Sequence, residues 1–200
     1  ARQTQLDDIP MVIARTGWSG ELSYELYLQD RKLGNKLFEL VYEAAEEFNG
    51  RVIAPNTIRT IEGGLLSYGI DFGREHNPFT IGFGRLVDVD QEIDFIGKEA
   101  LKKIKQNGTK EKLVGLELEG DPLTKAPENF WPVNDKDKKV GRVSRAYYSP
   151  RVGKNIALAI VDIEYADEGT IVSVDSPYGD FESKVVNIPW FQADKDTHLD

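Results

Sequence analysis

Alternating apolar and polar residues near the N-terminus predict a β-hairpin. The run from Pro10 to Arg15 holds Met11, Val12 and Ile13, which are strand-forming residues. A second run, Ser23–Leu28, alternates in side-chain character, and a Gly17–Gly20 turn separates the two runs. Side chains two apart on a strand point to the same side. One face of the second strand therefore carries Ser23, Glu25 and Tyr27, and the other carries Tyr24, Leu26 and Leu28.

Three later segments have the spacing of helices. The first begins after Asp30, a good N-cap, and ends at Asn49-Gly50. The second covers about Thr57–Ser67 and includes Gly63-Gly64, each of which costs on the order of 1 kcal/mol relative to Ala inside a helix. The third begins in 94–101 and ends near Asn107-Gly108. The apolar positions of the first helix, predicted to form a core-facing stripe, are Leu33, Leu37, Val41, Ala44, Ala45 and Phe48.

After the second helix the pattern predicts turns and then strands. A turn at 68–72 and an irregular stretch lead to a predicted strand region, Phe79–Val89. Beyond Thr109, regularly spaced short strands separated by turn residues predict a small barrel or sandwich. These strands are Lys112–Glu119, Lys139–Tyr148, Asn155–Asp162, Thr170–Ser176 and Gly179–Val186. The segment 121–134 has three prolines and the pair Phe130-Trp131, and it is predicted to be a loop that packs over another part of the molecule.

We expect an α+β part over residues 1–108, a C-terminal β-barrel over 109–191 and a frayed polar tail over 192–200. The domain boundary is placed near 108–112. With 200 residues and 40% hydrophobic side chains, the chain can bury a sizeable core.

Composition excludes several function classes. A net charge of −9 argues against a nucleic-acid partner, because phosphate binding needs a basic surface. No apolar run reaches the roughly 20 residues of a membrane span. The absence of cysteine removes thiol chemistry and favours a cytoplasmic protein. With only His76 and His198, a histidine metal site or a catalytic triad is not expected, and no metal is predicted.

The polar face of the second strand is the candidate site. Glu25 and Tyr27 lie side by side beyond a flexible turn, an arrangement that suits a flat, nitrogen-rich ligand. On spacing alone, an exposed sheet face with ordinary cross-strand polar pairs is the more common interpretation.

Several motifs together resemble the aminomethyltransferase family, that is, the glycine cleavage T-protein and its relatives. The turn 17–20 with Glu21 and Glu25 resembles the family's folate-site segment. The segments 61–71 and 95–101 resemble its helix-and-turn segments, and 140–143 with 148–150 and 156–159 resembles its barrel motif. The resemblance implies a T-protein-type folate-binding fold with a ferredoxin-like α+β part followed by a small antiparallel barrel.

The resemblance covers only the second half of the family's length. Members carry about as much chain again before this point, including the catalytic aspartate of T-protein. Two departures from the pattern stand out. The family's arginine two residues before the position of Glu62 is Thr60 here, and its Thr-Ser-Gly in the barrel is replaced at 144–146, where Arg145 is central. The first departure puts in doubt a folate contact from this helix.

The resemblance implies tetrahydrofolate as cofactor, with Glu25 accepting two N–H bonds from the pterin edge. Tyr27 would flank the ring and Trp18 would wall the pocket. Tyr68 is a weaker folate candidate and has a structural turn tyrosine as its alternative. No base is assigned. Glu62 and Asp71 are possible, but an Arg59–Glu62 helix ion pair and a turn-capping Asp71 are the preferred interpretations.

Within the family, residues 18–25 and 67–72 are most similar to the branch that demethylates sulfonium compounds such as dimethylsulfoniopropionate. This implies methyl transfer from a small sulfonium substrate to tetrahydrofolate. The alternatives are aminomethyl transfer with a lipoyl carrier protein as partner, a non-catalytic folate-binding module, or an interaction barrel with a vestigial site. Further partners expected are the missing N-terminal half of the same protein and a second copy in a homodimer.

Overall fold

A computed structural model describes residues 1–194. The described chain forms two compact units, residues 1–59 with 192–194, and Thr60–Phe191. The division falls within a short helix, whereas the barrel begins at Glu111, beside the boundary predicted from the sequence at 108–112. The domain limits predicted from the sequence, 1–108 and 109–191, therefore remain a proposal. The predicted tail 192–200 lies largely outside the described residues, as does His198.

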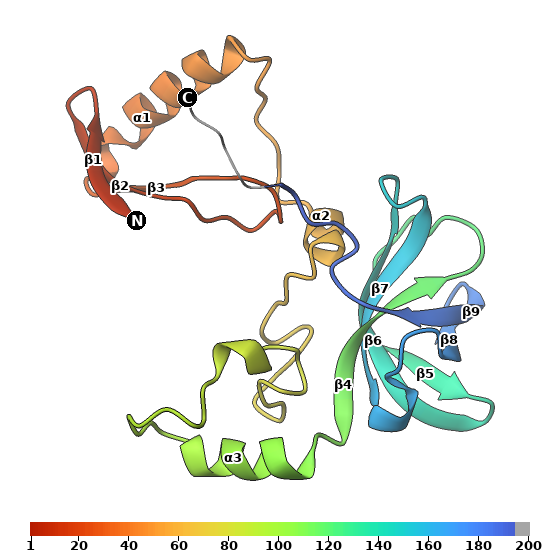
Figure 1. Cartoon of the computed structure of the whole chain (residues 1–200). Coiled ribbons are helices and arrows are strands. Elements are labelled where there is room, and N and C mark those ends of the chain that lie inside the picture. The colour runs from red at the N-terminus through yellow and green to blue at the C-terminus, as the bar shows by residue number, and fades with distance from the viewer. Residues whose placement is uncertain (195–200) are drawn as a thin grey trace. The chain divides into compact units, whose positions relative to one another are not determined.

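The first unit has a three-stranded antiparallel sheet in the order β1-β2-β3 (Figure 1). The strands are β1 (Arg2–Leu6), β2 (Ile9–Ala14) and β3 (Glu25–Leu28). Met11 pairs with Leu28 and Ala14 with Glu25, so the predicted hairpin is confirmed. β1 was not predicted, because its five residues are all exposed and have no apolar alternation.

A helical segment packs on this sheet. It starts with a 3₁₀ turn, η1 (Arg31–Leu33), and continues as α1 (Gly34–Glu46). Asp30 caps it as predicted, since its carboxylate accepts a bond from the Lys32 N–H at 3.0 Å. Ile9, Met11 and Leu37 are buried between sheet and helix.

The predicted core stripe of this helix is only partly correct. Leu33, Leu37 and Leu40 face the sheet, but Val41 is 39% exposed and Phe48 is 80% exposed. The reason is geometric: the sheet covers a narrow arc of the helix, and the apolar residues that follow 3.6-residue spacing fill a wider arc than that.

Helix α2 (Thr57–Glu62) ends five residues before the predicted Ser67. Asn56 caps its start, accepting a bond from the Ile58 N–H at 2.9 Å. Its end is set by Gly64, which has a φ of +62°, while the Leu65 N–H donates to the Thr60 carbonyl at 2.8 Å. Gly63-Gly64 therefore terminate the helix rather than weaken its interior.

The segment that follows is mostly turns. The turn at 68–72 is confirmed by the Gly69 N–H bond to the Phe72 carbonyl at 2.8 Å. The predicted strand Phe79–Val89 is wrong: the segment contains turns and a 3₁₀ helix, η2 (Gly84–Leu86), because Gly82 has a φ of +79°. Helix α3 (Lys98–Asn107) confirms the third predicted helix and lies between Gly97 and Gly108, both with positive φ.

The remaining strands close into a six-stranded antiparallel barrel in the order β4-β7-β6-β5-β8-β9, where β9 pairs back with β4 (Figure 1). The strands are β4 (Glu111–Leu118), β5 (Trp131–Asp135), β6 (Lys138–Ser149), β7 (Lys154–Asp162), β8 (Ile171–Ser176) and β9 (Gly179–Val186), with a 3₁₀ turn η3 (Ile163–Tyr165) after β7. Five were predicted. β5 was wrongly placed in a loop, and it closes the barrel by pairing with both β6 and β8.

Both faces of β7 are buried. Ala157, Ala159 and Val161 line the barrel interior. Ile156, Leu158 and Ile160 point outward and are covered by the segment that contains Ile61 and Leu66. The turn-rich segment is thus fixed to the outside of the barrel. The predicted α+β class with a small antiparallel barrel is confirmed. Over residues 1–194, none of the helices has both the length and the apolar character that crossing a membrane requires.

Candidate functional site

The candidate site of the first unit is the carboxylate of Glu25 at the start of β3. Two hydroxyl groups donate to the same oxygen, Oε2: Tyr27 at 3.0 Å and Thr16, which lies across the hairpin just after β2. Within the described residues no bond to Oε1 is formed, and the side chain is exposed. One oxygen is therefore fixed and the other faces solvent.

The predicted division of the strand faces holds. Leu26 and Leu28 pack against the buried cluster of the sheet, so Glu25 and Tyr27 point away from it. The Tyr27 ring is 52% exposed. Its hydrogen bond to the Glu25 carboxylate, reinforced by the carboxylate's charge, raises the pKa of the Tyr27 phenol. The phenol thus stays protonated and keeps donating.

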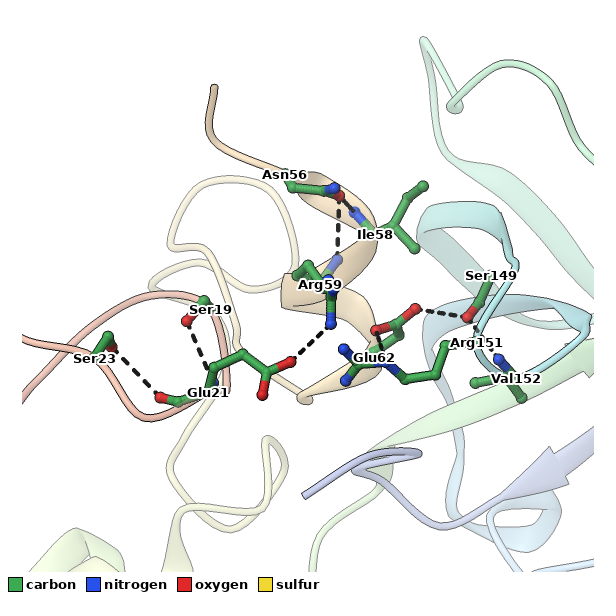
Figure 2. Close-up of polar contacts among 10 residues, drawn as sticks. All are labelled: Ser19, Glu21, Ser23, Asn56, Ile58, Arg59, Glu62, Ser149, Arg151 and Val152. Atoms are coloured by element: carbon green, nitrogen blue, oxygen red, sulfur yellow. Dashed lines mark hydrogen bonds and ion pairs between the residues drawn. The ribbon is translucent and has the colours of Figure 1, made fainter. Parts of the chain in front are cut away.

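The loop between β2 and β3 is tied down by a second acid. Glu21 Oε1 accepts a bond from Arg59 Nη1 at 2.7 Å (Figure 2). The Ser23 hydroxyl donates to the carbonyls of Thr16 and Glu21 at 3.3 and 3.4 Å. A Cβ on Gly17 would lie 1.8 Å from the Ser23 Oγ, so this close approach requires glycine. Trp18 lies on this loop and is 59% exposed.

A different acid of the second unit is fully engaged in structure. Asp71 receives a two-pronged ion pair from Arg145, with Nε to Oδ1 at 2.9 Å and Nη2 to Oδ2 at 2.6 Å. The Ser144 hydroxyl and the Ser67 N–H add bonds of 2.6 and 2.7 Å. Because the carboxylate is buried and each oxygen accepts two bonds, Asp71 is a structural anchor, as the turn-capping interpretation expected, and not an available base.

Glu62 lies at the end of α2 and is 3% exposed. The predicted Arg59–Glu62 ion pair is wrong, because Arg59 pairs with Glu21 and Glu62 is directed to the barrel. Its Oε1 accepts a bond from the Ser149 hydroxyl at 2.6 Å, and Arg151 Nε lies 3.7 Å from Oε2 (Figure 2). Residues three apart on a helix are neighbours, so local spacing favoured the pair, but contacts with residues distant in sequence hold Arg59 and Glu62 instead.

Tyr68 and His76 take structural positions. The Tyr68 ring is 64% exposed and packs edge-on against Phe72, with centroids 5.6 Å apart. The side chain of His76 is 3% exposed, and its Nδ1 accepts a bond from the Gly73 N–H at 3.0 Å. The turn tyrosine alternative thus accounts for the contacts of Tyr68.

Two residues of these networks were missed from the sequence. Thr16 follows the end of β2, and only the pairing of Ala14 with Glu25 brings it to the carboxylate. Arg145 is 74 residues from Asp71. The sequence signal that could have indicated the role of Thr16 was its position just after the end of the strand. For Arg145, the only signal in the sequence was that the segment 144–146 departs from the family motif.

Comparisons with known proteins cover nearly the whole chain. Residues 1–91 match the GCVT N-terminal domain, and residues 111–192 match the glycine cleavage T-protein C-terminal barrel domain. A dimethylsulfoniopropionate demethylase from Ruegeria pomeroyi is 34% identical over 171 residues, which is 86% of this chain and 46% of that protein. An aminomethyltransferase from Bacillus cytotoxicus is 33% identical over 193 residues, 95% of this chain and 51% of that protein.

The solved structure of glycine cleavage system aminomethyltransferase T from Bartonella henselae is similar in fold, with a TM-score of 0.76 at 19% identity. The alignment covers 90% of this chain and 49% of that one. The chain therefore spans about half the length of the curated relatives it matches.

Proposed function

Because this chain belongs to the glycine cleavage T-protein family, we propose that it supplies the folate-binding part of a tetrahydrofolate-dependent transferase. The observation that carries the proposal is the Glu25 carboxylate, held by Tyr27 and Thr16 at one oxygen and open at the other. A pterin presents a 2-amino group and a ring N–H on one edge. A carboxylate accepts both bonds, and such charge-assisted bonds are about twice as strong as neutral ones.

Tyr27 and Trp18 have supporting roles in this proposal. Tyr27 fixes the carboxylate and flanks the pterin ring with its exposed face. The exposed indole of Trp18 provides an apolar wall for the ligand. Glu21 and Arg59 hold the loop that carries this indole.

We propose further that the donor is a sulfonium compound, dimethylsulfoniopropionate, so that the products are methylthiopropionate and 5-methyltetrahydrofolate. The similarity to the Ruegeria pomeroyi enzyme supports this choice. The S–CH₃ bond breaks as the folate N–CH₃ bond forms, the electron pair stays on sulfur as a neutral thioether, and the folate nitrogen releases its proton. Since the leaving group is good, holding nitrogen, carbon and sulfur in line supplies most of the acceleration.

Aminomethyl transfer is the second candidate. It is favoured by the similarity to the Bacillus cytotoxicus enzyme, which extends over 95% of the chain. In that reaction a lipoyl carrier protein would be the partner that delivers the aminomethyl group. A folate-binding module without turnover is the third outcome.

The folate site is tested by Glu25→Gln. We expect tetrahydrofolate binding to weaken by about 1.5–3 kcal/mol, the usual effect of losing a charged hydrogen-bond partner. Isothermal titration calorimetry measures it, and circular dichroism checks that the fold is kept. Glu39→Gln, an exposed acid on α1 of the same unit, is the matched control. Equal affinity for Glu25→Gln and the control would remove Glu25 from the pterin site.

The donor is tested with the full-length protein and tetrahydrofolate. Formation of methyltetrahydrofolate from dimethylsulfoniopropionate, measured by mass spectrometry, supports demethylation. Formation of methylenetetrahydrofolate from an aminomethylated lipoyl carrier instead overturns the sulfonium proposal and leaves the folate site intact. Binding without either product indicates the non-catalytic module.

A further inference from the structure

A groove of about 530 Å³ on the barrel unit is not used by the proposed function. It lies between the segment 126–132, which leads into β5, and the turn at 175–178 between β8 and β9. Three aromatic residues, Phe130, Trp131 and Tyr178, and three prolines, Pro127, Pro132 and Pro177, line it. Its volume is within the usual range of ligand sites.

The apolar walls are held in place by the barrel. Trp131 begins β5 and is 4% exposed, and the Tyr178 ring packs against it edge-on with centroids 6.0 Å apart. Ser176 fixes the turn, since its Oγ accepts a bond from the Tyr178 N–H at 3.0 Å and donates to the Gly179 carbonyl at 2.9 Å. The groove is therefore formed before any ligand arrives.

The edge of the groove is acidic. Glu128 and Asp175 line it, and Asp175 lies directly opposite Asp180 in the β8–β9 pairing. Across the described residues, none of these three carboxylates forms an ion pair. Like charges opposite each other destabilise a hairpin, so a cation from outside would relieve a repulsion built into the strands. The neighbouring Arg142 is directed to His76 and Glu75, at 3.4 and 3.7 Å.

We propose that this groove binds an extended segment of a partner protein that contains prolines next to arginine or lysine. A polyproline II segment fits grooves lined by aromatic rings and loses little entropy on binding. The carboxylates complement the basic residues. Tyr178, which is 51% exposed, offers the open aromatic face for a proline, and the buried Trp131 supports it. The Arg142 guanidinium, 4.4 Å from the Phe130 centroid, covers that ring, so the three rings do not form a closed cage for a small cation.

The test uses the intact chain and a labelled synthetic peptide of alternating proline and leucine that ends in arginines, with binding measured by fluorescence anisotropy. We expect saturable binding that weakens with added salt. Tyr178→Ala should weaken it by about tenfold or more, as expected for an aromatic anchor. Asp175→Asn should weaken it by about threefold to tenfold and reduce the salt dependence.

Matched controls lie on the same barrel outside the groove. Ile171→Ala removes an exposed apolar side chain and Asp167→Asn an exposed charge, and both should bind the peptide as the parent does. Circular dichroism confirms that each variant is folded, and Asp175→Asn is a surface change that keeps the test valid if Tyr178→Ala unfolds.

The proposal is overturned if the peptide does not bind, or if peptides with glutamate in place of arginine or serine in place of proline bind equally well. Displacement of the peptide by tetramethylammonium at the same site, without discrimination among peptides, would assign the groove to a small cation instead. None of these results depends on folate binding.

Discussion

Arg145 and Thr60 belong to the two segments that depart from the family resemblance, and their side chains are in contact. Arg145 Nη1 donates to the Thr60 hydroxyl at 2.7 Å, and its Nη2 donates to the Leu65 carbonyl at 2.5 Å. The guanidinium thus enters from barrel strand β6 and meets α2 at Thr60. The same guanidinium forms the buried ion pair with Asp71, so Arg145 joins α2, the following turn and β6.

Asp71→Asn should destabilise the barrel unit by about 3–5 kcal/mol, because it leaves the buried Arg145 charge without its counter-ion. Urea unfolding followed by barrel tryptophan fluorescence measures the loss. The control is Asp90→Asn, which breaks the exposed pair of Asp90 with Lys105 and should cost less than about 1 kcal/mol. Equal effects of the two changes would show that the buried pair contributes no more than a surface pair.

Tyr27 gives a prediction about pH. Its phenol pKa is raised, first by the hydrogen bond to Glu25 and then by the carboxylate's charge. Glu25→Gln removes the charge, so the pKa should fall back toward its ordinary value near 10. The deprotonation midpoint of Tyr27, measured by NMR of labelled tyrosine rings, should therefore shift to lower pH. An unchanged midpoint would mean that the two side chains are not bonded in solution.

At the scale of the elements, the end of α2 depends on one backbone conformation. Gly64 has a φ of +62°, and a Cβ there would meet only Ile188, at an ordinary 3.5 Å. The cost of a side chain is therefore conformational rather than steric crowding. Gly64→Ala should destabilise the barrel unit by about 1–2 kcal/mol.

Gly64→Asn is the discriminating variant, because asparagine tolerates the left-handed region better than alanine does. Thermal unfolding by circular dichroism should place Asn between Gly and Ala. A larger loss for Asn than for Ala would indicate that side-chain volume, and not backbone conformation, sets the requirement.

Elements with a strong local signal were predictable. The hairpin of β2 and β3 and the strands β4 and β6 to β9 have alternation or continuous apolar runs that decide their type. β5 has the same alternation, with Trp131 and Val133 buried, but it is short and contains Pro132, a residue typical of loops. Its pairing with both neighbours is a long-range effect that no local pattern encodes.

The candidate site likewise has features that the local sequence pattern predicts and features that depend on tertiary contacts. The shared face of Glu25 and Tyr27 follows from the period of a strand and was predictable. The contact of Thr16 with Glu25 depends on the register of the hairpin, and the role of Asp71 depends on a residue of a distant strand. Helix spacing alone suggested that Glu62 pairs with Arg59, but tertiary contacts with Glu21 and Ser149 determine both partners.

At the scale of the whole molecule, α1 carries more apolar surface than its sheet can cover. Phe38, Val41, Tyr42 and Phe48 are between 39% and 80% exposed, and Phe38 stacks on Tyr42 with centroids 5.9 Å apart. Phe38 lies three residues before Val41 and four before Tyr42, so these three form a second stripe beside the buried one, and Phe48 follows just after the helix ends. Contiguous exposed apolar surface of this kind marks a contact with another chain segment. The relatives, which are about twice as long, have such additional chain.

The isolated chain should consequently bind a hydrophobic dye and associate with itself as its concentration rises. Phe38→Glu combined with Phe48→Glu should reduce dye fluorescence and shift sedimentation toward the monomer, because each change places a charge in the exposed stripe. Leu37→Ala is the control on the buried face: it should cost about 2–5 kcal/mol of stability without lowering dye binding. If the double variant binds dye as the parent does, the exposed stripe is not the adhesive surface, and the outward-facing Ile93 and Ile96 of the other unit become the next surface to substitute.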